Sequence, residues 1–311
     1  MQLLVVIIAT ILGFTYGYYS DGLIFNSDIC LFAGLTLIMP SLFNVKLKDI
    51  QLIGKYKTVI FKSIFMNYIL LPLLAISIGL LTSNFGIAAG LFLLSVLSGG
   101  GMVMHWIKKT NADTSFGFLL LFINLLLVSL SLFMLDAFGA LSSEYFSASY
   151  MDKISVSHFA WPVVELLIII PFIVSRVVIY IKPLLGLIEK YRAYISNISI
   201  FVIITYLFSL QSTQVLVEIY DFEPELIGIS LLATFGFYLL ALIASNFIFN
   251  LDSEQERAAF WHSVTRYITL ALVISTFSIN TFGASMILPI MFAYIVQIPF
   301  SILLIKKIPV S

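Results

Sequence analysis

The sequence predicts an all-α polytopic membrane protein with ten transmembrane helices, arranged as two inverted five-helix repeats. Three observations carry this prediction: long uncharged apolar runs, a composition that is 61% hydrophobic and 10% charged, and basic residues gathered in alternate loops. Soluble domains contain about 25% charged residues, and a run of about 20 apolar residues can cross the hydrocarbon core of a bilayer. We therefore expect residues 1–311 to form a single transmembrane domain embedded in lipid.

The apolar runs divide into two sets of five on either side of the longest outer loop, residues 139–158. Repeat one covers residues 1–138 and repeat two covers residues 159–311. Because five is odd, the second set enters the membrane with the opposite polarity, as in inverted-repeat transporters. The predicted helices cover residues 3–19, 22–44, 58–81, 84–106, 114–138, 159–181, 193–211, 225–249, 258–281 and 284–305.

The basic residues predict the orientation of the chain. The outside loops contain only Lys153, whereas twelve basic residues lie in the inside loops. Short loops rich in Lys and Arg stay in the cytoplasm, so both termini are expected there, with the protein in the inner membrane of a cell. Lys62 and Arg176 fall inside runs but close to inner ends, from which long side chains can reach the headgroups. The twelve are Lys46, Lys48, Lys55, Lys57, Lys108, Lys109, Lys182, Lys190, Arg192, Arg257, Lys306 and Lys307.

Several classes of function do not fit the composition. The 16 basic and 16 acidic residues balance, whereas a nucleic-acid-binding protein needs a basic face. Cys30 is the only cysteine, so an intrachain disulfide and a cysteine metal cluster are impossible. No spacing of His, Glu or Cys suggests a metal site, and no nucleophile lies near a base in a catalytic pattern. We expect neither an enzyme nor a resident cofactor. The first run lacks a basic leader and is expected to be a retained helix.

The run 84–106 contains Ser98, three consecutive glycines and Met102. Each glycine inside a helix costs roughly 1 kcal/mol relative to alanine, and freed backbone at this depth is tolerated only beside protein or a watery cavity. The pattern predicts a broken helix, in which Ser98, Gly99, Gly100 and Met102 bind a substrate. The alternative is close packing of two helices across small residues, although packing motifs space their glycines four apart.

The run 258–281 contains Thr265, Arg266 and Tyr267. Arg266 lies about 12 Å from the inner end of its helix, and burying an arginine there costs at least a few kcal/mol. No acidic residue is predicted at the same depth, so an anionic substrate could supply the missing charge through a bidentate contact. The alternative is a structural arginine that reaches inward or pairs with Glu165.

Three deep amides, Asn67, Asn124 and Gln297, lie at a depth similar to that of the glycines and Arg266. A lone amide in a membrane helix usually holds neighbouring helices together. Because these three accompany the glycines and the arginine, we expect them to contribute to the substrate site. If transport is coupled to protons, Glu165, Asp28 and His262 are the candidate carriers.

These motifs resemble the bile acid:sodium symporter superfamily, and within it most closely the arsenical-resistance, or arsenite efflux, transporters. The likeness extends from residue 34 to residue 305. It implies a core built around broken, crossing helices four and nine, a separate panel, and a secondary transporter. The residues that carry it are Gly34-Leu35, Met39-Pro40, Val45-Lys46, Asn67, Pro72-Leu73, Met102-Val103, Trp106, Asp113, Asn124, Thr265-Arg266, Leu270-Ala271-Leu272 and Gln297-Ile298-Pro299.

The chain also departs from its relatives at positions that matter for chemistry. Gly99 stands where the arsenite carriers have a cysteine, Gln297 replaces their acidic residue and Tyr267 replaces an asparagine. Val103-Met104 and His262 stand where the sodium symporters have Ser-Asn and an acidic residue. We expect alternating-access transport of a small anionic solute. Arsenite or antimonite efflux is one alternative. A passive anion channel is another, although the polar residues cluster at one depth instead of forming a continuous stripe.

Overall fold

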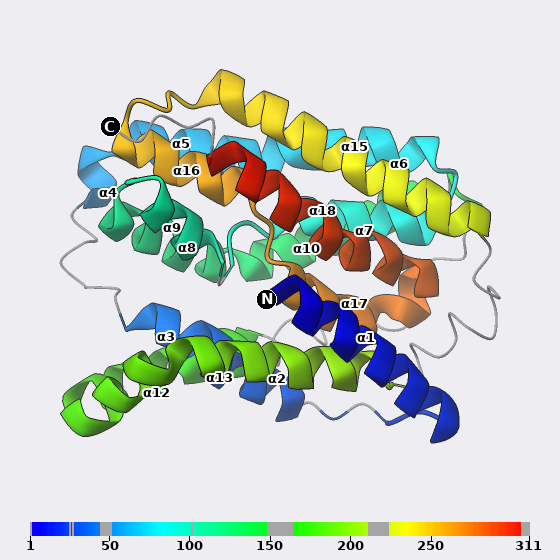
Figure 1. Ribbon diagram of the computed structural model, residues 1–311. Coiled ribbons are helices and arrows are strands. Elements are labelled where there is room, and N and C mark those ends of the chain that lie inside the picture. Colours follow the sequence, from blue (N-terminus) through cyan, green and yellow to red (C-terminus); the bar gives the residue numbers. More distant parts are fainter. Residues whose placement is uncertain are drawn as a thin grey trace. The chain divides into compact units, whose positions relative to one another are not determined.

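The computed structural model describes residues 2–24, 26, 28–43, 52–100, 102–147, 164–210 and 224–305. The chain divides into two compact units (Figure 1). Unit 1 contains Met1–Asn44 and His158–Glu223, and unit 2 contains Val45–Ser157 and Pro224–Ser311. The described residues are helical, with two isolated β-bridges and no strand among them. The all-α prediction is confirmed for this part of the chain.

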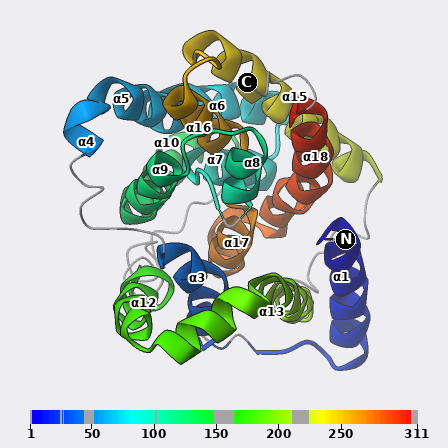
Figure 2. The ribbon, with the colours of Figure 1, turned by 60° about the vertical axis from the view of Figure 1, so that its left-hand side comes forward.

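Unit 1 is built around the packing of its first helix against its longest one. Figure 2 shows α1 and α13 side by side. Gly13 of α1 lies against the backbone of Thr205 in α13, and the centroids of the Phe14 and Phe208 rings are 4.9 Å apart. Beyond α1, the amide of Leu23 donates to the carbonyl of Ser209 at 2.8 Å. The elements are α1 (Gln2–Tyr19), α2 (Asp28–Ala33), η1 (Gly34–Ile38), α3 (Met39–Leu42), η4 (Glu165–Ile169), α12 (Ile170–Tyr180) and α13 (Lys182–Phe208).

Arg176 of α12 has a structural role within unit 1. Its guanidinium donates to the carbonyl of Leu42, the last residue of α3, and its Nε donates to Ser175 Oγ at 3.3 Å. The guanidinium carbon also lies 5.2 Å from the centre of the Phe172 ring. The last carbonyls of a helix have no partner within it, so this arginine satisfies one of them.

Three helical segments widen by one residue per turn directly before a proline. Pro40, Pro72 and Pro171 are each the second residue of the α-helix that follows a π-helical segment. Proline has no amide hydrogen to donate, and its ring clashes with the carbonyl four residues earlier. A π-turn relieves this conflict because it shifts the hydrogen bonds to a wider spacing. The π-turns therefore explain how these helices continue through a proline.

Unit 2 is built around α7, whose residues from Gly86 to Val96 are all buried. Gly79 of α6 lies in close contact with Ala88 of α7, and Gly86 lies equally close to η5. Figure 2 shows α7, α8 and α16 enclosed by other helices of the unit. The elements are α4 (Leu52–Lys55), α5 (Lys57–Phe65), η3 (Met66–Leu70), α6 (Leu71–Leu81), α7 (Phe85–Val96), α8 (Val103–Lys109), α9 (Thr114–Leu126), α10 (Val128–Ser142), α15 (Pro224–Ile248), α16 (Glu254–Val264), α17 (Ile268–Phe282), η5 (Ala284–Met286) and α18 (Ile287–Ile305).

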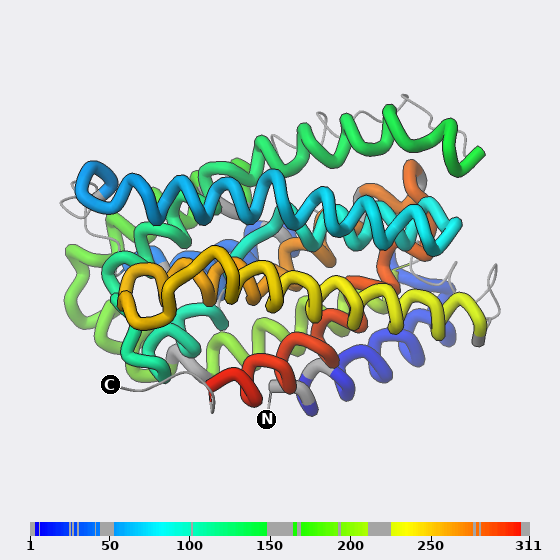
Figure 3. The backbone as a smooth tube through the Cα atoms, turned by 90° about the horizontal axis from the view of Figure 1, so that it is seen from above, coloured from blue at the N-terminus to red at the C-terminus, as the bar shows by residue number. Residues whose placement is uncertain are grey.

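Three described stretches are long and apolar enough to cross a membrane alone: Lys57–Leu81, Glu225–Ile248 and Ala284–Ile305. The first is the continuous rod of α5, η3 and α6 (Figure 3). Two bent helix pairs, with angles of 47° and 115°, raise the number to five. Other predicted runs are divided into shorter helices here, so their lengths alone do not test the prediction of ten spans and an inverted repeat.

Candidate functional site

Two helices of unit 2 are interrupted at the same place. The helix pair α7 and α8 is separated by residues 97–102, and α16 and α17 by residues 265–267. The two interruptions pair as a short antiparallel bridge between Ser98 and Arg266. The amide of Gly99 donates to the carbonyl of Thr265 at 2.9 Å, and the amide of Tyr267 donates to the carbonyl of Leu97 at 3.0 Å. The predicted broken helix over residues 84–106 is confirmed, and its partner is the arginine-containing run.

We call the two paired interruptions, residues 97–102 and 265–267, the crossing. Glycine is required at two of its positions. Gly99 and Gly100 have φ angles of +77° and +121°, which side chains of L-residues rarely adopt. A Cβ atom on Gly99 would lie 2.7 Å from Nδ1 of His262, and one on Gly100 would lie 3.1 Å from the ring of Tyr267. Gly101 lies outside the described residues. Gly99 and Gly100 are therefore needed for the break itself, and their lack of a side chain also permits the close contacts with His262 and Tyr267.

Arg266 is 2% exposed and directs its guanidinium at two helix ends. Its Nη1 donates to the carbonyl of Ser95 in the last turn of α7 at 2.9 Å. Its Nη2 donates to the carbonyl of His262 at 2.8 Å and also to that of Ser263, both in the last turn of α16. The side-chain oxygen of Asn67 accepts a further bond from Nη2 at 2.8 Å. The guanidinium therefore caps both half-helices.

The charge on Arg266 is balanced without a carboxylate among the described residues. Each helix C-terminus carries a partial charge of about −0.5, so the two ends of α7 and α16 together offset about one positive charge. All the partners of the guanidinium are neutral oxygens. Its Nε is buried without a partner. These partners all belong to unit 2, whereas Glu165, the partner named in the alternative interpretation, belongs to unit 1.

The amide of Gln297 in α18 holds the crossing from another side. Its Oε1 accepts the backbone amide of Arg266 at 2.6 Å and the hydroxyl of Tyr238 at 2.8 Å. Asn67 in turn donates to the carbonyl of Ser63, one turn earlier, at 2.8 Å. Both amides lie at the crossing, as their depth in the sequence predicted, but their described contacts are with protein groups.

Asn124 of α9 and His262 of α16 form a second buried group beside Ser98. The Asn124 amide nitrogen lies 3.0 Å from Ser98 Oγ and 3.3 Å from His262 Nδ1, while Ser98 Oγ donates to the carbonyl of His262 at 2.8 Å. Nε2 of His262 lies 2.9 Å from the carbonyl of Gly117. A neutral ring that donates from Nε2 and accepts at Nδ1 satisfies both contacts, so this geometry gives no support to a proton carrier at His262.

The remaining candidates fall into two groups. Thr265 and Tyr267 lie at the crossing, where the Thr265 hydroxyl donates to the carbonyl of Trp261 at 2.5 Å. Met102 precedes α8 and is half-buried. Glu165 and Asp28 have exposed side chains and belong to unit 1. The crossing therefore gathers the predicted substrate residues, together with His262, all of which belong to unit 2, whereas Glu165 and Asp28 belong to unit 1.

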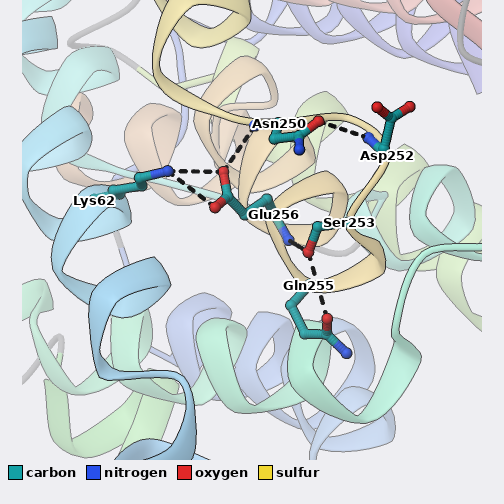
Figure 4. A network of polar contacts seen from close by, with 6 residues as sticks. All are labelled: Lys62, Asn250, Asp252, Ser253, Gln255 and Glu256. Carbon is teal, nitrogen blue, oxygen red and sulfur yellow. Dashed lines mark hydrogen bonds and ion pairs between the residues drawn. The ribbon is translucent and has the colours of Figure 1, made fainter.

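A polar cluster that the sequence analysis did not identify lies at the other end of α16 (Figure 4). Lys62 of α5 lies 2.9 Å from both carboxylate oxygens of Glu256. The same carboxylate accepts the backbone amide of Asn250 at 2.7 Å, and Ser253 caps α16 by accepting the amide of Glu256. Lys62 is therefore the ion-pair partner of Glu256, and the expectation that its side chain reaches the headgroups stays a prediction. The sequence Ser253-x-x-Glu256 is a helix-start signal that could have located α16.

Two further contacts join this cluster to the turn before α9. Asp113 caps α9 by accepting the amide of Phe116 at 2.9 Å, and its second oxygen accepts from Gln255 at 3.0 Å. Arg257, expected in an inside loop, is instead 2% exposed and donates to the carbonyl of Thr110 at 2.6 Å. The start of α16 is therefore fixed to its surroundings before the helix reaches the crossing.

Comparison with known proteins identifies the family. A search of the curated proteins finds no match. The family model described as "Sodium Bile acid symporter family" matches residues 31–219, which is more than half of the chain. The match begins in α2, includes the interruption between α7 and α8, and extends beyond α13. Members of this family are membrane transporters of small solutes, typically coupled to sodium. The chain belongs to the sodium bile acid symporter family.

Proposed function

We propose that this protein is a secondary transporter that moves a small anionic solute across the inner membrane by alternating access. The observation that carries the proposal is the crossing of two interrupted helices around Arg266. Interrupted helices at mid-depth expose backbone groups that bind substrates and ions in transporters. The solute binds beside Ser98, Gly100 and Met102 from one interruption and Thr265 and Tyr267 from the other.

The net charge of the crossing supports an anionic solute. Each interrupted helix presents one C-terminal and one N-terminal end there, with partial charges of about −0.5 and +0.5. The guanidinium of Arg266 offsets the two C-terminal ends, so about one positive charge remains at the N-terminal ends of α8 and α17. The described partners of Arg266 include no carboxylate. A buried site with this excess attracts an anion.

The division of the chain into units supports an inverted repeat of ten helices. Unit 1 takes Met1–Asn44 from the first half and His158–Glu223 from the second, and unit 2 takes the remainder of both halves. The bridge likewise pairs Ser98 of the first half with Arg266 of the second. In our proposal one unit moves against the other around the crossing, and both termini lie in the cytoplasm.

Arsenite or antimonite efflux is less well supported. The position at which the arsenite carriers place a cysteine is Gly99, where the backbone angle and the ring of His262 leave no room for a side chain. Cys30, the only cysteine of the chain, belongs to α2 in unit 1. If the solute moves with a proton, the exposed carboxylates of Glu165 and Asp28 remain the candidate carriers, because both nitrogens of the buried His262 ring contact protein groups.

The proposal is tested in two stages with the purified full chain. A thermal-shift screen of acetate, phosphate, sulfate, arsenite and a bile acid selects a ligand, and proteoliposomes then measure uptake of its labelled form. We expect saturable uptake that is stimulated by unlabelled solute on the other side. Non-saturating conductance would instead indicate a passive channel and overturn the proposal.

A further inference from the structure

The oxygens around the guanidinium of Arg266 form the kind of site that binds sodium in other transporters. Interrupted membrane helices commonly coordinate Na⁺ through the carbonyls of their C-terminal ends. Here the carbonyls of Ser95, His262 and Ser263 converge from α7 and α16, and the amide oxygen of Asn67 completes the group. Four neutral oxygens from three elements therefore surround one positive group.

A sodium ion does not fit this place in addition to the arginine. Every one of these oxygens already accepts a hydrogen bond from Arg266. The partial charge of the two helix ends, about −1 in total, is already offset by the guanidinium. A second cation would be repelled by it, and the described contacts of Arg266 include no carboxylate to compensate a further charge.

The neighbouring residues are equally unsuited to sodium. His262 contributes an imidazole whose two nitrogens bond Asn124 and the carbonyl of Gly117. Val103 and Met104, at the start of α8, carry no oxygen in their side chains. Oxygen is the ligand that hard cations of this kind prefer. The chemistry of the crossing therefore disagrees with the sodium coupling that is typical of the family.

We propose that the guanidinium of Arg266 permanently occupies the position of the coupling cation, so that this protein transports its solute without sodium. The proposal rests on the transporter function proposed above and names its ion coupling. A bound Na⁺ enters and leaves in each cycle, whereas a side chain stays attached. The crossing therefore keeps its positive charge in every state, and a sodium gradient has no site on which to act.

The first test needs no knowledge of the solute. Thermal unfolding of the detergent-purified wild-type chain is measured in NaCl, in KCl and in choline chloride at equal ionic strength. A ligand present at about 100 times its dissociation constant stabilises the folded state enough to raise the melting temperature by several degrees. We expect the same melting temperature in all three salts. A specific rise in NaCl would overturn the proposal.

The second test replaces the attached cation with a free one. Arg266→Ala removes the side chain and leaves space, whereas Arg266→Met fills the space with an apolar chain. We expect millimolar guanidinium to raise the melting temperature of Arg266→Ala and to leave wild type and Arg266→Met unchanged. An Arg266→Ala variant that is as stable as wild type without guanidinium would contradict the proposal. If neither variant folds, the wild-type salt comparison still decides.

Transport measurements separate this proposal from the function on which it rests. Once the screen provides a solute, uptake is compared with inward Na⁺ and K⁺ gradients of equal size. Equal uptake under the two gradients supports the proposal that Arg266 takes the place of the coupling cation. Saturable uptake that requires Na⁺ would support the transporter function but contradict the proposal that Arg266 replaces the coupling cation. Conductance without saturation would contradict the transporter function itself.

Discussion

The two ends of α16 hold positive charge in opposite ways. At its start, Lys62 pairs with the carboxylate of Glu256, and the Lys62 side chain is 33% exposed. At its end, Arg266 is 2% exposed and binds only neutral oxygens, three of them peptide carbonyls. The comparison shows two ways of holding a cation. The partly exposed Lys62 is held by a carboxylate, and the buried Arg266 is held by the ends of two helices.

The difference has an energetic consequence. Exposed and partly exposed ion pairs contribute about 0–1 kcal/mol, because water competes for both charges. A buried charge that loses its partners costs about 3–5 kcal/mol. The two ends of one helix should therefore respond very differently to substitution, and the following variants measure that contrast.

Arg266→Ala is expected to have the largest effect. It leaves the carbonyls of Ser95, His262 and Ser263 without this donor in a buried place. Each buried polar group that loses its partner costs about 1–3 kcal/mol, so we expect a larger loss of unfolding free energy than in the variants below. Uptake of solute is lost with it. Thermal unfolding in detergent and uptake in proteoliposomes measure the two effects, with Arg266→Lys as the charge-preserving control. Wild-type stability in the alanine variant would show that the two helix ends do not need the guanidinium.

Gly99→Ala is expected to have the next largest effect. The φ angle of +77° is unfavourable for alanine by about 1–2 kcal/mol, and the new Cβ would press on His262. Gly236→Ala in α15 is the matched control, because nothing lies within 4 Å of its Cβ position. The control should be neutral or slightly stabilising. Equal melting temperatures for the two variants would contradict the assigned backbone conformation.

Substitutions of Gln297 test the oxygen that accepts from Arg266 and Tyr238. Gln297→Leu leaves two buried donors unpaired and should cost about 1–3 kcal/mol. Gln297→Glu keeps an oxygen at the same place and adds a charge opposite to that of Arg266, so it should unfold close to wild type. Thermal unfolding of both variants distinguishes them. A glutamate variant as unstable as the leucine variant would show that the amide nitrogen, and not the oxygen, is required.

Glu256→Gln should have the smallest effect. It removes the charge that Lys62 contacts but keeps an oxygen for the amide of Asn250. The expected loss is at most about 1 kcal/mol, and it should shrink further in high salt because ions screen exposed pairs. Unfolding is measured at low and high KCl. A loss as large as that of Arg266→Ala would contradict the contrast between the two ends of α16.

The sequence predicts where the two helices are interrupted, but it does not predict which groups contact Arg266. Three consecutive glycines and a deep arginine are visible in the chain because both are costly inside a membrane helix. The partners of Arg266 are not visible, because the carbonyls of Ser95, His262 and Ser263 belong to the backbone and every residue has one. These carbonyls form a site only because Ser95 lies beside Arg266, which follows it by 171 residues in the sequence.

The position of His262 differs from the predicted one for a local reason. The predicted run began at residue 258, which placed this histidine near an inner end. The structure begins α16 at Glu254, with Ser253 as its cap, so His262 lies in the last turn beside the crossing. Hydrophobicity alone cannot detect a polar first turn, whereas the capping signal of Ser253 and Glu256 can.

The most direct measurement of the central claim is a high-resolution cryo-electron microscopy map of the full chain in lipid nanodiscs prepared in NaCl. We expect density for the Arg266 side chain joined to the carbonyls of Ser95 and His262, with both helices interrupted and no separate ion peak between them. A spherical peak coordinated by these carbonyls, with the guanidinium turned away, would contradict the account.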